Sequence, residues 1–247
     1  YDDNIVGNTG NDTLSTGNGG KDTIDGGKGD DVLSVDYGYS SGGITTTFNA
    51  TTNIGAITAD TNRVNYNNIE RLNIKGTAYD DNIVGNTGND TLSTGNGGKD
   101  TIDGGKGDDY LSGGYSSGNQ TFYGGFGNDY LTGGNGNDSL YGGSGTDTFT
   151  FDSYDGGVDS IYDFNATNEL IKVLAYGFGG GLSSGSLKAN QFIIGTSANT
   201  SVQRFIYNSA TGELFFDQDG SASGFTQVKF AQLSGGLSLT ENNFVAF

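Results

Sequence analysis

The sequence predicts an all-β protein, a parallel β-roll solenoid that ends in a C-terminal β-sandwich-like cap. Residues Gly124 to Thr150 form three consecutive nonapeptides, GGFGNDYLT, GGNGNDSLY and GGSGTDTFT. Residues 1–31 recur without a change at 79–109. The 247 residues include 46 glycines and no proline or cysteine. Tight turns that alternate with short hydrogen-bonded strands agree with all three observations.

Each nonapeptide divides into a turn and a strand. Glycines at positions 1, 2 and 4 allow the chain to reverse within six residues, because glycine adopts positive φ angles without a steric penalty. The last three residues alternate, so one apolar side chain points inward. In the three clean repeats these side chains are Leu131, Leu140 and Phe149. With a turn every nine residues, every second strand returns to the same wall, which predicts two thin parallel sheets.

The sixth position of the repeat is aspartate, and this spacing predicts a cation site. Aspartates of successive turns on one edge are expected to lie about one strand spacing, roughly 4.8 Å, apart. Two carboxylates at that separation require a cation between them. The chain has no histidine and no cysteine, so the ligands are all oxygen. Flexible all-oxygen coordination is the preference of Ca²⁺.

The pattern resembles the GGxGxDxUx repeat of RTX proteins, the calcium-binding β-roll proteins secreted by type I systems. The match recurs in register along the chain. The aspartates expected to bridge Ca²⁺ ions are Asp12, Asp22, Asp31, Asp90, Asp100, Asp109, Asp129, Asp138 and Asp147, with Asp3 and Asp81 as partners in half-formed turns. The resemblance implies that turn carbonyls complete the sites, here those of Gly26, Lys28, Gly104, Lys106, Gly124, Phe126, Gly133, Asn135, Gly142 and Ser144.

Four segments are expected in chain order. Residues 1–34 form a first calcium roll segment, 35–78 a linking β segment without calcium, 79–151 a second calcium roll segment, and 152–247 the cap. The chain opens inside a repeat, which suggests that it is the C-terminal part of something longer. In the repeat from Gly113 to Tyr123, Gln120 stands in place of aspartate, so this turn is expected to bind calcium weakly or not at all.

The linking segment is rich in threonine, as in ITTTFNATTNIGAIT. Its threonines favour β-strands that continue or flank the roll. An ice-binding or glycan-binding surface is a minor alternative.

The end of the chain concentrates the large apolar residues and is expected to cover the last rung of the roll. These residues are Phe192, Ile193, Phe205, Ile206, Leu214, Phe215, Phe230, Leu233 and Phe244. The final ENNFVAF resembles the uncleaved C-terminal signal that type I secretion machinery reads in the RTX family. This resemblance implies an extracellular, secreted or cell-surface protein.

Composition excludes several functions. The formal net charge of -18 argues against nucleic acid as a partner, since nucleic-acid binding requires a basic stripe. Without histidine there is no Ser-His-Asp triad and no HExxH zinc site. The sequence holds no membrane-spanning apolar run. Burial of one apolar side chain per nonapeptide contributes too little free energy to offset the conformational entropy lost when nine residues become ordered. We therefore expect the repeats to be disordered without calcium and to fold when it binds.

Two functions remain. The first is a non-enzymatic, calcium-folded extracellular protein of a surface array, such as an S-layer, sheath or adhesin. It would carry a secretion signal and could self-associate or contact cell-surface glycans. The alternative is the non-catalytic tail of a secreted hydrolase, a protease or lipase. The 78-residue duplication favours the array, because a secretion tail requires only a few clean repeats.

Overall fold

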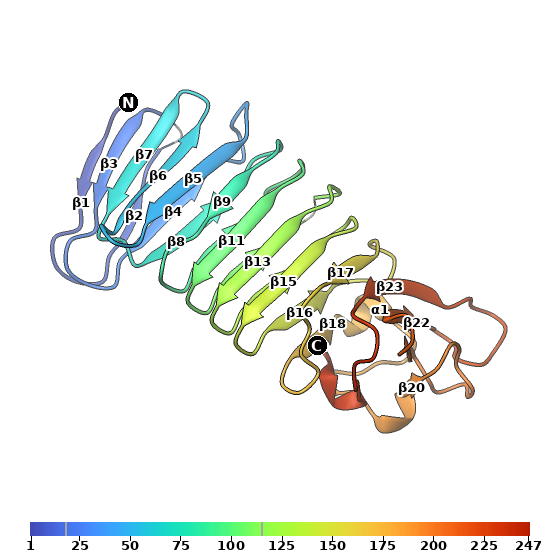
Figure 1. Ribbon diagram of the computed structural model, residues 1–247. Helices are drawn as coiled ribbons and strands as arrows, with labels where there is room; N and C mark the ends of the chain where they lie inside the picture. The colour runs from blue at the N-terminus through green and yellow to red at the C-terminus, as the bar shows by residue number, and fades with distance from the viewer. Residues whose placement is uncertain (18, 115) are drawn as a thin grey trace.

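The computed structural model describes residues 1–17, 19–114 and 116–247. Asn18 and Tyr115, which belong to the predicted repeats at 17–25 and 113–123, lie outside the described residues. The molecule is an elongated roll of two sheets with the C-terminal cap at one end (Figure 1). The predicted all-β solenoid class is confirmed.

Within the described residues, sheet 1 has 14 strands and sheet 2 has 10. In spatial order, sheet 1 contains β1 (Asn4–Val6), β3 (Lys21–Asp25), β7 (Asn62–Asn67), β6 (Ile54–Ala59), β5 (Ile44–Asn49), β9 (Asn82–Val84), β11 (Thr101–Lys106), β13 (Thr121–Phe126), β15 (Ser139–Ser144), β17 (Asp159–Ile161), β23 (Val228–Gln232), β22 (Glu213–Phe216), β21 (Phe205–Asn208) and β20 (Phe192–Ile194). Sheet 2 contains β2 (Thr13–Ser15), β4 (Val32–Asp36), β8 (Arg71–Lys75), β10 (Thr91–Ser93), β12 (Tyr110–Ser112), β14 (Tyr130–Thr132), β16 (Thr148–Phe151), β18 (Leu170–Val173), β24 (Phe244–Ala246) and β19 (Gly185–Ser186).

The repeats place one apolar side chain of every strand on the axis between the sheets. In sheet 1, Ile83 pairs in register with Ile102, Ile102 with Phe122, and Phe122 with Leu140. In sheet 2, Leu92, Leu111, Leu131 and Phe149 form the corresponding row. All eight of these side chains have zero exposure. The predicted inward positions Leu131, Leu140 and Phe149 are therefore confirmed.

Residues 35–78 run through both sheets. β5, β6 and β7 form an antiparallel meander in sheet 1, between β3 and β9. In sheet 2 the same segment contributes the last two residues of β4 and all of β8, which lies between β4 and β10. The segment thus joins the two identical stretches by strand pairing on both of its sides.

The cap continues both sheets. β23 pairs with β17 and β24 pairs with β18, both in parallel. Three short helices accompany them: α1 (Ala175–Phe178) and the 3-10 helices η1 (Ala189–Gln191) and η2 (Glu241–Asn243). None of the helices within the described residues has the length and apolar character needed to cross a membrane.

The cap core differs in detail from the expected set. Phe205, Ile206, Leu214, Phe230, Leu233 and Phe244 are buried, whereas Phe192, Ile193 and Phe215 are only half-buried. Phe216 occupies the core position instead of Phe215, because the alternation in β22 turns Leu214 and Phe216 to one face.

Candidate calcium sites

The turns of the roll form two rows, one along each edge. Turns on the first edge lead from sheet 1 to sheet 2, as 124–129 leads from β13 to β14. Turns on the second edge lead back from sheet 2 to sheet 1, as 133–138 leads from β14 to β15.

The first glycine of a turn packs against the aspartate that ends it. A Cβ on Gly124 would lie 2.4 Å from Oδ2 of Asp129 and 2.5 Å from the carbonyl oxygen of Gly142 in the next turn. Glycine thus leaves a space bordered by a carboxylate oxygen and a carbonyl oxygen.

Two further glycines of each turn have the backbone conformation that glycine favours. Gly125 and Gly127 have φ angles of 108° and 136°. This conformation allows the chain to reverse within six residues and to present its carbonyl groups to the interior of the turn.

The sixth-position aspartates form a hydrogen-bonded ladder along the first edge. In four steps of this ladder, Oδ1 of an aspartate accepts the backbone N–H of the aspartate one turn earlier, for example Asp109 N to Asp129 Oδ1 at 2.8 Å. Asp129 N donates in the same way to Asp147 Oδ1, at 2.9 Å. The same contact joins Asp12 to Asp31 and Asp90 to Asp109. These partners are 18 to 20 residues apart in sequence, which is the predicted return distance.

A second ladder follows the opposite edge. It joins Asp3 to Asp22 at 2.9 Å and Asp81 to Asp100 at 2.8 Å. Gln120 occupies one step, where its Oε1 accepts from Asp100 N at 2.7 Å and its own N–H donates to Asp138 Oδ1 at 2.7 Å.

In seven ladder aspartates the Oδ2 oxygen has no hydrogen-bond partner, whereas Asp81 Oδ2 accepts Thr77 N and Asp90 Oδ2 accepts Asn86 N. Within the described residues, the buried side-chain oxygens in this state include Oδ2 of Asp12, Asp31, Asp100, Asp109, Asp129, Asp138 and Asp147. Outside the turns, Tyr66 Oη and Asp219 Oδ1 are also buried without a hydrogen-bond partner. A buried carboxylate oxygen without a donor is costly, and a cation beside it removes that cost. The residues of the turns therefore fit a hard, oxygen-liganded ion.

The pKa values of the aspartates in the turns also favour a bound cation. Burial raises the pKa of Asp90 to about 8 and those of Asp100 and Asp129 to about 7, with a further upward contribution from neighbouring carboxylates. Burial likewise raises the pKa values of Asp109 and Asp138 to about 6. The folded roll thus disfavours the charged carboxylates unless a positive charge neutralises them.

A cation in these turns must take several ligands from the backbone. Among residues 1–17, 19–114 and 116–247, no three acidic side chains converge on one point. The first-position glycines predicted as carbonyl ligands are buried: Gly26, Gly104, Gly124, Gly133 and Gly142. At the third positions the side chains are exposed, and the predicted ligands are the backbone carbonyls of Lys28, Lys106, Phe126, Asn135 and Ser144. The carbonyls of Lys28, Phe126 and Ser144 each accept one backbone N–H, which leaves each a second lone pair.

The predicted aspartates differ in how deeply they are buried in the turns. Those buried in the turns are Asp22, Asp31, Asp81, Asp90, Asp100, Asp109, Asp129, Asp138 and Asp147. Asp12 is half-buried and Asp3 is exposed.

Three acidic residues outside the predicted set occupy equivalent positions. Glu70 Oε2 accepts Asp31 N at 2.9 Å and so extends the first ladder into the linking segment. Asp159 Oδ1 accepts Asp138 N at 3.0 Å and extends the second ladder into the cap. Glu169 is 4% exposed at the last turn of the first edge. Each is followed two residues later by an inward apolar side chain, as in Glu70-Arg71-Leu72. A search for Asp or Glu followed by any residue and then an apolar one would have found all three.

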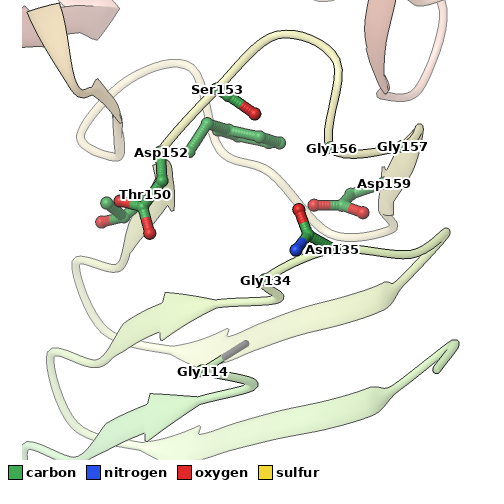
Figure 2. Close-up of a pocket in the computed structure, with 10 residues that line it drawn as sticks. Gly114, Gly134, Asn135, Thr150, Asp152, Ser153, Gly156, Gly157 and Asp159 are labelled. Atoms are coloured by element: carbon green, nitrogen blue, oxygen red, sulfur yellow. The ribbon is translucent and has the colours of Figure 1, made fainter. Parts of the chain in front are cut away.

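A cavity of about 150 Å³ opens where the roll meets the cap. The turn at 152–159 lacks the first two glycines of the repeat, and the space is bordered instead by Asp152 and Ser153. Figure 2 shows Asn135 and Asp159 facing the same space beside Gly134. Burial, together with the adjacent Asp138 carboxylate, raises the pKa of Asp159 well above its ordinary value. The last turn of the second edge is thus an oxygen-lined variant of the turns before it.

Comparison with known proteins agrees with this geometry. The family described as the RTX calcium-binding nonapeptide repeat matches in four copies, over residues 1–33, 75–111 and 115–149. No curated protein matches the chain. Among solved structures, a subunit of the Azotobacter vinelandii mannuronan C5-epimerase is 27% identical, with a TM-score of 0.33, over 64% of this chain and 78% of that one.

The extracellular lipase of Serratia marcescens is 20% identical, with a TM-score of 0.26, and the match covers 99% of this chain and 38% of the lipase. RTX nonapeptide repeats bind Ca²⁺, which confirms the predicted cofactor. The chain therefore contains RTX calcium-binding nonapeptide repeats, over residues 1–33, 75–111 and 115–149.

Proposed function

We propose that this chain is a calcium-folded, non-catalytic structural module of an extracellular array, such as an S-layer, sheath or adhesin. The observation that supports it best is the pair of carboxylate ladders, in which seven of the described aspartates have an Oδ2 that is buried without a donor, as in Asp129, whose Oδ1 accepts Asp109 N. In this proposal the partnerless oxygen is the calcium ligand. Each aspartate bridges the ions of neighbouring turns.

The proposed ligands are the eleven aspartates predicted from the repeat, together with the turn carbonyls at first and third positions. Asp159 joins them at the cap junction, and Glu70 at the linking segment. Ca²⁺ supplies the positive charge that the buried carboxylates lack, and it fixes turns whose glycines would otherwise be free to move.

Secretion and surface attachment also belong to the proposal. RTX repeat proteins are typically secreted, and millimolar extracellular calcium matches the weak affinity of extracellular sites, about 10⁻⁴ to 10⁻³ M. We place the type I secretion signal in the C-terminal ENNFVAF. A structural role accords with the exact duplication of residues 1–31 at 79–109. The duplication lengthens the roll and repeats the same turns, but it adds no different kind of site.

The test is small-angle X-ray scattering through a calcium titration, with magnesium at equal concentration as the control. Calcium should reduce the radius of gyration from near the ~54 Å of an unfolded chain of this length toward the ~18 Å of a compact one, offset upward by the rod shape. Magnesium should not, because it demands a regular octahedral site. A rise in forward scattering with compaction would support array assembly. Compaction at monomer mass would instead indicate a folding and export module.

A further inference from the structure

Residues 79–109 are seated on the linking segment 35–78. On sheet 1, β9 lies beside β5, with Asn82 opposite Thr45. On sheet 2, β10 lies beside β8, with Leu92 opposite Ile74. The contact surface therefore consists of the edges of β5 and β8 and the apolar core between the two sheets.

Specific hydrogen bonds join the linking segment to residues 79–109. Ile44 N donates to Asp81 Oδ1 at 2.7 Å, and Leu72 N donates to Asp90 Oδ1 at 2.6 Å. The hydroxyl of Thr46 donates to the carbonyl of Val84 at 2.8 Å. The linking segment thus satisfies carboxylate and backbone groups that the roll sequence offers on its N-terminal side.

The same 31 residues stand at 1–31 with those groups uncovered. Asp3, the equivalent of Asp81, is exposed, and Val6 is 50% exposed. A Cβ on Gly10 would meet nothing within 4 Å, whereas on the equivalent Gly88 it would lie 1.9 Å from the carbonyl oxygen of Glu70. Among the residues that the structure describes, no strand lies beside the outer edges of β1 and β2.

The turn itself differs between the two copies. Asn8 has a left-handed φ of 74°, and its Nδ2 donates to the carbonyl of Val6 at 3.3 Å. The equivalent Asn86 donates instead to the carbonyl of Ile69 through Nδ2, at 3.0 Å, and to Asp90 Oδ2 through its backbone N–H, at 2.7 Å. Contact with the linking segment therefore accompanies a different turn conformation in an identical sequence.

We propose that the edge formed by β1 and β2 is an interaction surface whose partner is a second copy of the segment 35–78, supplied by another 78-residue unit in tandem. The segment has two faces, and both fit the same 31-residue sequence. Its β7 already pairs with β3 of residues 1–31, with Tyr66 opposite Ile24, and its β8 pairs with β4, which directly follows residue 31, with Leu72 opposite Leu33. Its β5 and β8 hold β9 and β10. Units of this kind stack on one another through contacts that are already present in the fold.

The source of the partner follows from the same contacts. In a folded chain β5 and β8 are already covered by β9 and β10, so a second folded chain cannot offer them. A tandem unit can, because its linking segment would be followed directly by residues 1–31. The inference rests on the duplication and not on the proposed surface role.

The test is an extended chain in which a second copy of residues 32–78 is joined directly before residue 1. A Thr13→Ser marker on an exposed position of the first copy separates its peptides by mass from those of residues 79–93. Hydrogen exchange is then measured in saturating calcium. The marked peptide, covering 1–15, should exchange at least tenfold more slowly than in the original chain and should approach the rate of 79–93.

The control carries Ile74→Asp in the added copy only, where the carboxylate would face Leu14. This variant has the same length, and the marked peptide should remain as fast as in the original chain. The proposal is overturned if the marked peptide does not slow in the extended chain, whether or not the added segment is itself protected. It is also overturned if the Ile74→Asp control slows the peptide equally.

Discussion

In the roll, each strand contributes one fully buried side chain, as Leu131 does in β14, whereas the cap buries a cluster of phenylalanines. The rings of Phe178, Phe205, Phe216 and Phe230 lie with their centroids 5.0 to 6.1 Å apart. The partnerless aspartate oxygens gather in the turns of the roll. The cap is thus stabilised by apolar burial, whereas the roll contains buried carboxylate oxygens that a bound cation would neutralise, although strands of both regions belong to the same two sheets.

Removing calcium should separate the two regions, and this is the largest effect that we expect. In excess chelator the amides of β9 to β16 should lose most of their protection from hydrogen exchange. The amides of β21, β22 and β23 should keep theirs, because their core does not depend on carboxylates. Loss of protection in both regions at the same calcium concentration would show that roll and cap form one cooperative unit, contrary to this comparison.

Acid should partly replace calcium in the roll. The pKa of Asp90 is about 8 in the folded chain, and those of Asp100 and Asp129 are about 7, against about 3.9 for an unfolded aspartate. The folded roll binds more protons than the unfolded chain between these values, so its stability without calcium falls as pH rises from about 4 to about 8.

With calcium the dependence should reverse, since ligands must lose their protons to bind the ion. Thermal unfolding followed by circular dichroism at pH 5 and pH 8, in chelator and in calcium, checks both signs. A chain in chelator that is more stable at pH 8 than at pH 5 would contradict the role of the buried carboxylates.

Most of this contrast could be predicted from the sequence. The nine-residue period fixed the two sheets, the inward Leu131, Leu140 and Phe149, and the two rows of aspartates, because period and glycine placement act locally. The meander of β5 to β7 could not be predicted, since a threonine-rich strand has no signal that selects its neighbour. Glu70 and Asp159 were missed as ladder residues because their turns lack the two glycines that open the repeat. Phe216 was mistaken for Phe215 because two adjacent phenylalanines do not reveal which one faces inward.

Substituting one ladder aspartate should remove calcium without removing the ladder. In Asp129→Asn the remaining Oδ1 can still accept Asp109 N, but an amide nitrogen replaces the partnerless Oδ2. We expect the loss of at least one bound ion per chain, by equilibrium dialysis, and at least a tenfold higher calcium midpoint for folding, about 1.4 kcal/mol. Asn137→Asp, at an exposed position of a neighbouring turn, is the control and should change neither. Unchanged stoichiometry in Asp129→Asn would exclude Asp129 as a ligand.

Gln120 offers the opposite change. Its Oε1 fills the place of a ladder oxygen, and its Nε2 donates to Ser116 Oγ at 2.7 Å and approaches the carbonyl of Gly98 at 3.5 Å. The amide nitrogen thus contacts oxygens in a turn where other repeats would hold an ion. Gln120→Asp should add one bound calcium ion per chain, and Gln120→Asn, which has the same shape as the Asp variant without its charge, should add none. Equal stoichiometry in the two variants would mean that the turn, and not the side chain, excludes the ion.

An effect on stability alone, with no change in calcium binding, is expected on the outer face of sheet 1. Tyr141 stacks on Tyr123 with ring centroids 4.9 Å apart and on Tyr162 at 4.6 Å, so three successive rungs are joined by aromatic contacts. Tyr141→Ala removes both contacts and should cost about 1 to 3 kcal/mol, since a stacked pair contributes roughly 0.5 to 1.5 kcal/mol. Tyr39→Ala, at a tyrosine that is 90% exposed, is the matched control and should cost less than about 0.5 kcal/mol.

The calcium dependence distinguishes this stack from the ladders. Because Tyr141 contacts no carboxylate of the ladders, its substitution should lower the unfolding temperature in calcium while leaving the number of bound ions unchanged. A change in stoichiometry would mean that the outer stack fixes the spacing of the rungs, and with it the distance between the carboxylates on both edges. In that case the aromatic contacts would belong to the calcium sites and not to an independent layer of the roll.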